Sequence, residues 1–153
     1  MEQDPAERGP RLEVVLVSRC FVKGKDGRIL LIKRSSSDSH NPNKWEAPGG
    51  KLEQGEDVTQ TLENEVMEET RLVVKPVHPL AFISSHVIGN EGKYFGFTYV
   101  VIFSITEVVG NTQVVLSDEH AEHEWVPYEK LFEYDLTPET RKAAAHLERY
   151  LAT

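Results

Sequence analysis

Cysteine, basic charge and long apolar runs are all scarce in this 153-residue chain. Its one cysteine, Cys20, excludes an internal disulfide and a zinc site built from cysteines. Lys and Arg number 17 against 25 Asp and Glu, and the net charge of −8 argues against binding to a nucleic-acid backbone. No apolar run approaches the ~20 residues that a membrane-spanning helix needs. The sequence therefore predicts a cytoplasmic protein that binds neither a membrane nor a nucleic-acid polymer.

The N-terminus is polar and lacks the basic-then-apolar layout of a secretory signal. We expect residues 1–10 to form a flexible tail and residues 11–153 to form a single domain. A domain of that size buries roughly two-thirds of its chain surface. No repeat or long linker interrupts it, and the polar stretch RSSSDSHNPN is interpreted as a loop within the domain.

Strand patterns dominate the chain and helical patterns are few, which predicts a mixed, twisted sheet with helices packed on its faces. The two strand patterns at residues 12–22 and 28–34 flank an Asp-Gly turn and predict a hairpin. Residues 72–88 contain two prolines, which favours a bent or edge strand. Residues 93–109 form the strongest strand pattern, and residues 137–152 predict one final helix.

One predicted helix gathers acids at its C-terminal end. Glu65, Glu68 and Glu69 share a face at ~100° per residue, beside an apolar stripe. The last two lie where the helix dipole disfavours them, and no Lys or Arg occurs between Lys51 and Arg71 to pair with them. Each unfavourable placement costs only a few tenths of a kcal/mol, so a solvated acidic face stays an alternative. A hard divalent cation would remove the repulsion.

The same stretch resembles the Nudix box, G-x5-E-x7-R-E-U-x-E-E-x-G-U, where U is aliphatic. The box runs from Gly50 to Leu72, and its matching positions are Gly50, Glu56, Glu65, Val66, Glu68, Glu69 and Leu72. The preceding WEAPGG is similar to the lead-in that is usual in the family. The chain is thereby identified as a member of the Nudix superfamily. The resemblance implies an α/β fold, an α/β/α sandwich with a central mixed β-sheet.

Two positions depart from the box. Asn64 stands in place of an arginine that orients the carboxylates, and it can only donate amide hydrogen bonds. Arg71 stands in place of the glycine that ends the helix, where a left-handed residue costs on the order of 1 kcal/mol unless the helix ends differently. We expect a helix extended by one turn to bring Arg71 near Glu68 and partly replace the missing charge. The departures concern catalytic efficiency more than fold or metal binding.

The resemblance also implies a divalent cation, Mg²⁺ or Mn²⁺, as cofactor. Its ligands would be Glu65, Glu68, Glu69 and the carbonyl of Gly49. The catalytic set would be Glu65, Glu68, Glu69 and Glu119. Support for the site would come from Gly50, Glu56, Asn64 and Arg71. The general base stays open between Glu65 and the loop residues Glu119, Glu122 and His120, and a transition-metal pair of His120 and His123 is a weaker alternative.

Three further residues are candidate substrate contacts: Lys33, Arg34 and Trp125. Lys33 and Arg34 end the second strand, where a solvated strand end is an equal alternative, and Trp125 is favoured as core or pocket wall. The resemblance implies hydrolysis of a pyrophosphate bond in a nucleoside diphosphate linked to another moiety, with a nucleoside triphosphate as the default substrate. A catalytically weak nucleotide-binding module is the alternative. The family also favours a homodimer.

Overall fold

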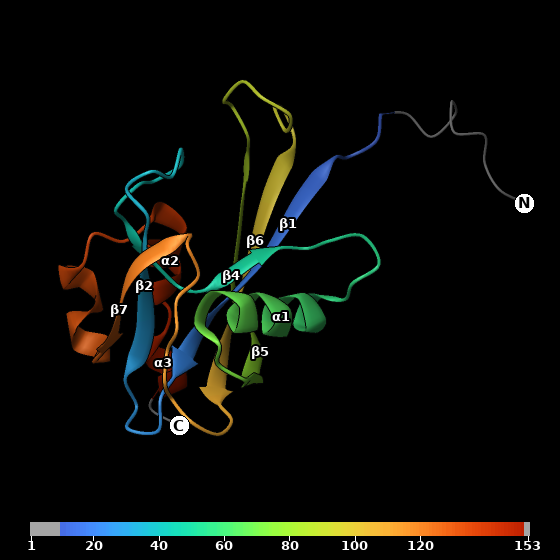
Figure 1. Ribbon diagram of the computed structural model, residues 1–153. Coiled ribbons are helices and arrows are strands. Elements are labelled where there is room, and N and C mark those ends of the chain that lie inside the picture. Colours follow the sequence, from blue (N-terminus) through green and yellow to red (C-terminus); the bar gives the residue numbers. More distant parts are fainter. Residues whose placement is uncertain (1–9, 152–153) are drawn as a thin grey trace, which may run out of the picture.

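The computed structural model describes residues 10–151, so the predicted tail lies outside the described residues apart from Pro10. A seven-stranded mixed sheet forms the centre, in the order β3-β2-β1-β6-β5, with β4 paired to β1 and β7 paired to β2 (Figure 1). The strands are β1 (Val14–Lys23), β2 (Ile29–Arg34), β3 (Trp45–Glu46), β4 (Gly49–Lys51), β5 (Val74–Val87), β6 (Thr98–Val108) and β7 (His120–Val126). The helices are α1 (Val58–Thr70), the 3₁₀ helix η2 (Tyr128–Glu133), α2 (Pro138–Ala144) and α3 (Glu148–Leu151).

Two apolar cores lie on opposite faces of the sheet, because successive side chains of a strand point in opposite directions. Cys20 of β1 packs with Leu62 and Val66 of α1 on one face. Phe21, the next residue, enters the other core, which includes Ala143 of α2. Figure 1 shows α1 on one side of the sheet and α2 behind it. The predicted α/β/α sandwich with a central mixed sheet is therefore confirmed.

The predicted hairpin exists, but its two strands separate almost at once. Only Lys23 opposite Ile29 is paired between β1 and β2. Beyond that pair β1 runs parallel to β6 along its whole length, while β2 pairs with β3 and β7. The short strand β4 pairs with β1 in the opening and brings Gly49 opposite Arg19. The opening between β1 and β2 is where the candidate site forms.

The C-terminal helix is interrupted, so the prediction of one continuous helix is wrong. The amides of His146 and Leu147 donate to carbonyls three residues back, at 2.9 and 3.1 Å, which makes a tight turn between α2 and α3. This turn buries Leu147 in the core and stacks His146 on Phe82, with ring centroids 4.6 Å apart. Among residues 10–151, none of the helices has the length and apolarity to cross a bilayer.

Candidate active site

The glycine turn before β4 lies directly against the acids of α1. Glu69 is buried, and its Oε1 accepts the backbone N–H of Gly49 at 2.8 Å. A Cβ on Gly49 would collide with the Ser18 carbonyl, and a Cβ on Gly50 would lie 2.6 Å from Oε2 of Glu65. Gly49 therefore requires glycine, because backbone atoms of the neighbouring strand occupy the space of a side chain and its φ is 153°. At Gly50 the Glu65 carboxylate occupies that space, so a side chain there would displace the carboxylate.

Burial and crowding weaken the acidity of two of these carboxyl groups. Burial, then the charges of Glu68 and Glu119, raise the pKa of Glu65 to about 7. Burial raises the pKa of Glu69 to about 8, although Arg19 and the Gly49 amide act in the opposite direction. The predicted loop acid Glu119 thus lies close enough to the acids of α1 for its charge to raise the pKa of Glu65. Both carboxyl groups therefore hold their protons more tightly than an exposed glutamate does.

The loop before β7 is anchored on the C-terminal end of α1. The amides of Val115 and Ser117 donate to the carbonyls of Thr70 and Glu69, at 3.0 and 3.3 Å. These are carbonyls that a helix leaves without an intrahelical partner at its C-terminus. The anchor explains how Glu119, far from α1 in the sequence, comes to the acidic face.

The two departures from the Nudix box have different outcomes. Asn64 Nδ2 donates to Oε2 of Glu56 at 3.2 Å, so the uncharged residue still holds the acid at the start of the box. Arg71 adopts the left-handed conformation, with φ of 63°, and its N–H caps the helix on Met67. The predicted extension of the helix is therefore wrong. Within residues 10–151, no ion pair joins Arg71 to Glu68.

A buried charge network, which the sequence reasoning missed, stands behind the acids. Glu46 is 2% exposed, and both of its oxygens accept from Nη1 of Arg34, at 3.2 and 3.1 Å. Arg19 lies 3.5 Å from the same carboxylate and donates to the Ala47 carbonyl. Burial alone would raise the pKa of Glu46, but Arg19, His120 and Arg34 hold it below its ordinary value. Glu46 is therefore ionised, and both of its oxygens accept hydrogen bonds.

His120 connects this network to Glu69. Its Nε2 lies 2.9 Å from Glu46 Oε2, and its Nδ1 lies 3.6 Å from Glu69 Oε2, too long for a hydrogen bond. Ligand atoms of these three residues all fall within 4.8 Å of one another. His123, on the same strand, is exposed and outside this group, so the alternative pair of His120 with His123 is not formed.

The three predicted substrate contacts are not brought together. Arg34 lines the main cavity beside Glu46. Lys33 donates to Glu122 at 3.1 Å, which ties both side chains to each other rather than to the acids of α1. Trp125 lies near the hairpin turn, where it lines a separate hollow of about 270 Å³ with Gly24. Sequence position alone could not show that Trp125 lies at the other end of β2.

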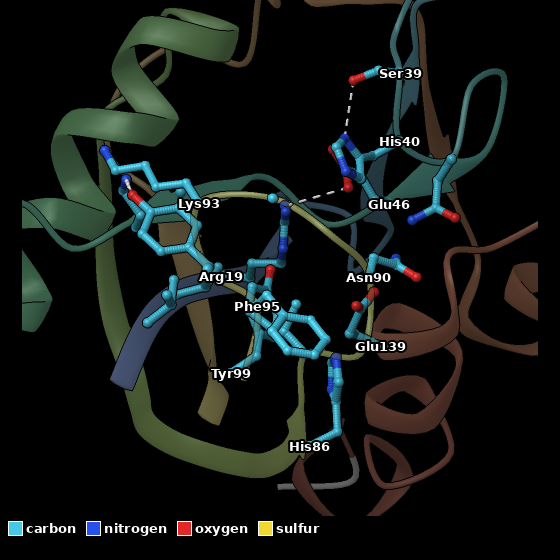
Figure 2. A pocket seen from close by; sticks show the side chains of 18 of the residues that line it. Arg19, Ser39, His40, Glu46, His86, Asn90, Lys93, Phe95, Tyr99 and Glu139 are labelled. Carbon is cyan, nitrogen blue, oxygen red and sulfur yellow. Dashed lines mark hydrogen bonds and ion pairs between the residues drawn. The ribbon is translucent and has the colours of Figure 1, made fainter. Parts of the chain in front are cut away.

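A cavity of about 850 Å³ opens beside the glycine turn (Figure 2). Charged and polar groups on its wall include Lys51 and Lys93, and Lys51 donates to the hydroxyl of Tyr94 at 2.6 Å. Phe95 also lines the cavity, although 62% of its surface is exposed. Further lining residues seen in Figure 2 are Arg19, His86, Asn90, Tyr99 and Glu139. The arrangement places cations and aromatic faces within one cavity next to a carboxylate cluster.

Comparisons with known proteins agree with this geometry. The family model described as NUDIX domain matches residues 15–147. Nucleoside triphosphatase NudI of Salmonella agona (strain SL483) is 28% identical over 133 residues, which cover 82% of this chain and 92% of the relative. The MutT protein from Methanosarcina mazei Go1 has a TM-score of 0.75 at 24% identity, covering 95% of this chain and 100% of that one. The MutT NUDIX hydrolase from Burkholderia pseudomallei has a TM-score of 0.73 at 26% identity, covering 88% and 98%. The chain therefore belongs to the Nudix superfamily, as its box implied, and is a Nudix-type pyrophosphohydrolase.

Proposed function

We propose that the protein hydrolyses a nucleoside triphosphate at a pyrophosphate bond and depends on a divalent cation to do so. The observation that carries the proposal is the position of the acids. Glu65 and Glu69 have raised pKa values and lie against a two-glycine turn, and Gly50 of that turn lines the cavity that also contains Lys51 and Lys93.

The residues fit a divalent cation. Their carboxylates crowd one another, and a Cβ at Gly49 or Gly50 would fill the space beside them. We assign the ligands to Glu65, Glu68, Glu69 and the Gly49 carbonyl, because Mg²⁺ and Mn²⁺ favour such oxygens. When bound, the ion neutralises phosphate oxygens and lowers the pKa of an attacking water.

The chain's own groups supply the proton transfer and the positioning. Glu65 and Glu119 are the candidates to accept the proton of the attacking water. Glu119 is favoured because Glu65 is assigned to the ion, and a carboxylate bound to a cation is a weaker base. Glu56, held by Asn64, supports the start of the helix.

The cavity supports a nucleotide as substrate. Its volume of about 850 Å³ is of the size that holds small-molecule ligands. Lys51 and Lys93 offer positive charge to phosphates, while Phe95 and Tyr99 offer aromatic faces to a base. The relative from Salmonella agona is named a nucleoside triphosphatase, which agrees with this class.

The alternative of a catalytically weak binding module is not favoured by any contact in the site. That alternative was suggested by the departures from the box at Asn64 and Arg71, and neither departure removes a carboxylate. Asn64 keeps its bond to Glu56, and Arg71 lies at the end of the helix. A cytoplasmic location and a homodimer stay predictions.

A substrate panel tests the proposal. Nucleoside triphosphates, nucleotide sugars and dinucleoside polyphosphates are incubated with Mg²⁺ or Mn²⁺, and release of phosphate, pyrophosphate and nucleoside monophosphate is followed. We expect turnover of triphosphates that EDTA abolishes. Glu69→Gln should lower the rate by on the order of 100-fold, whereas Glu63→Gln, exposed on the same helix, should not. No turnover of any compound would overturn the proposed activity, and turnover indifferent to Glu69→Gln would overturn the site.

A further inference from the structure

One buried nitrogen in the site has no hydrogen-bond partner. The side chain of His120 is 2% exposed, and its Nδ1 is unpartnered. The ring is fixed at its other nitrogen, because Nε2 lies 2.9 Å from an oxygen of Glu46. The Glu46 carboxylate is ionised and only accepts hydrogen bonds, so Nε2 is the donor of this pair and Nδ1 is the ring nitrogen left for another partner.

Nδ1 faces the second oxygen of Glu69. Oε1 of Glu69 is occupied by the Gly49 amide, and Oε2 is the oxygen that lies 3.6 Å from His120 Nδ1. The two atoms are too far apart to hydrogen-bond each other, yet close enough for one small partner to contact both. A divalent cation between them would satisfy the buried nitrogen.

The surrounding contacts have the arrangement of a metal-binding histidine. Such a histidine usually donates its second ring nitrogen to a carboxylate, which fixes the tautomer and the ring orientation. Glu46 is that carboxylate here, and it is itself held by Arg34 and Arg19. Since Arg34 and the imidazole already donate to its oxygens and Arg19 lies 3.5 Å away, we assign Glu46 to orienting His120 rather than to the ion.

We propose that His120 Nδ1 is a further ligand of the divalent cation, together with Glu69 Oε2, so that the centre combines nitrogen and oxygen ligands. This rests on the proposed metal dependence of the enzyme. Both ions favour carboxylate oxygens, but Mg²⁺ dehydrates reluctantly and keeps to oxygen ligands, whereas Mn²⁺ is a transition metal that loses less by accepting an imidazole nitrogen. The site should therefore bind Mn²⁺ more tightly than Mg²⁺.

The direct test uses no variant and no substrate. Untagged wild-type protein is prepared with natural-abundance and with ¹⁵N-labelled histidine, loaded with Mn²⁺, and examined by pulsed electron paramagnetic resonance. We expect a nitrogen coupling to Mn²⁺ that changes with the isotope. A Mn²⁺ complex without histidine coupling would overturn the proposal while leaving the proposed function intact. A protein that binds no divalent cation would overturn both.

A pair of variants on β7 assigns the coupling. His120→Gln removes the nitrogen ligand, and His123→Gln is the control, since His123 is exposed on the same strand. Isothermal titration should show the Kd for Mn²⁺ rising about tenfold or more in His120→Gln, with the Kd for Mg²⁺ changing by less than about threefold. Circular dichroism checks that both variants are folded. If the Kd values for Mn²⁺ and Mg²⁺ rose by the same factor, His120 would affect only the charge or the folding of the site, and the proposal would be wrong.

Discussion

At the scale of single residues, the absence of a side chain at Gly50 allows the Glu65 carboxylate to lie close to the turn. Gly50→Ala would place a Cβ 2.6 Å from Glu65 Oε2, so the carboxylate must move. We expect loss of most of the cation-dependent activity but a decrease of at most about 1 kcal/mol in the free energy of unfolding, because the Glu65 side chain is flexible and can move aside. Urea unfolding and initial rates measure the two effects.

Gly89→Ala is the matched control for this change. A Cβ at Gly89 would meet nothing within 4 Å, and its backbone is not in the left-handed region. We expect its stability to stay within about 0.5 kcal/mol of the wild type. If Gly50→Ala behaved in the same way as Gly89→Ala, Glu65 would not depend on the glycine turn.

Arg71 offers a test of the second departure from the box. Its left-handed backbone at the end of α1 is a conformation that glycine adopts without steric cost. Arg71→Gly should therefore raise the free energy of unfolding by up to about 1 kcal/mol and leave the rate unchanged. A fall in the rate, measured at saturating Mg²⁺, would show that the arginine side chain serves the site after all.

At the scale of the element, α1 makes the stability of the cation-free protein depend on pH. The pKa values of Glu65 and Glu69 are raised from 4.5 to about 7 and about 8. The folded state then holds protons that the unfolded chain releases, so this contribution is complete below about pH 4.5 and is lost as the pH rises through 7 to 8. The pKa of Glu46 is lowered, so its contribution to stability is lost as the pH falls. That effect has the opposite sign and lies at lower pH than the effect of Glu65 and Glu69.

Thermal unfolding in EDTA measures this dependence. We expect the Tm to fall from about pH 5.5 to about pH 8.5, and the gain in Tm on adding Mg²⁺ to grow over the same range, because metal ligands must be deprotonated. Glu69→Gln should flatten the dependence, and Glu63→Gln should retain it. A Tm that rises with pH in EDTA would contradict the assignment of raised pKa values.

The same helix shows what the sequence could predict and what it could not. The acidic face and the box were readable because helical spacing fixes which side chains share a face. His120 was a candidate from the sequence, but its bond to Glu46 was not predictable, since that bond depends on the pairing of β2 with both β3 and β7. The break after α2 was missed for a similar reason: His146 stacks on Phe82, a residue of a distant strand.

At the scale of the whole molecule, the cavity draws its wall from several segments, and its aromatic side can be tested separately from the acids. Phe95→Ala should raise KM for a triphosphate by on the order of tenfold with little change in kcat, because stacking contributes equally to ground and transition states. Leu80→Ala is the control, since Leu80 is 61% exposed and does not line the cavity. Equal KM values for the two variants would remove Phe95 from the substrate site.

The fold class could be predicted from alternating strand patterns and the box, while strand order could not. The hairpin pattern suggested that β1 and β2 stay paired, yet each strand finds its longer partner far along the chain. The strand order is the one that buries both faces of the sheet, and this burial depends on where α1 and α2 pack. The positions of Trp125 and Lys33 outside the main cavity follow from the same rearrangement.

The parallel pairing of β1 with β6 has a kinetic consequence. Val14 lies opposite Thr98, so the chain must close a loop that contains the whole box before these strands can meet. Such long-range pairing slows folding. The glycine turn and the acids of α1, by contrast, lie within residues 49–69 and contact each other over a short loop. We therefore expect the meeting of β1 with β6, rather than the assembly of the acidic turn, to set the rate of folding.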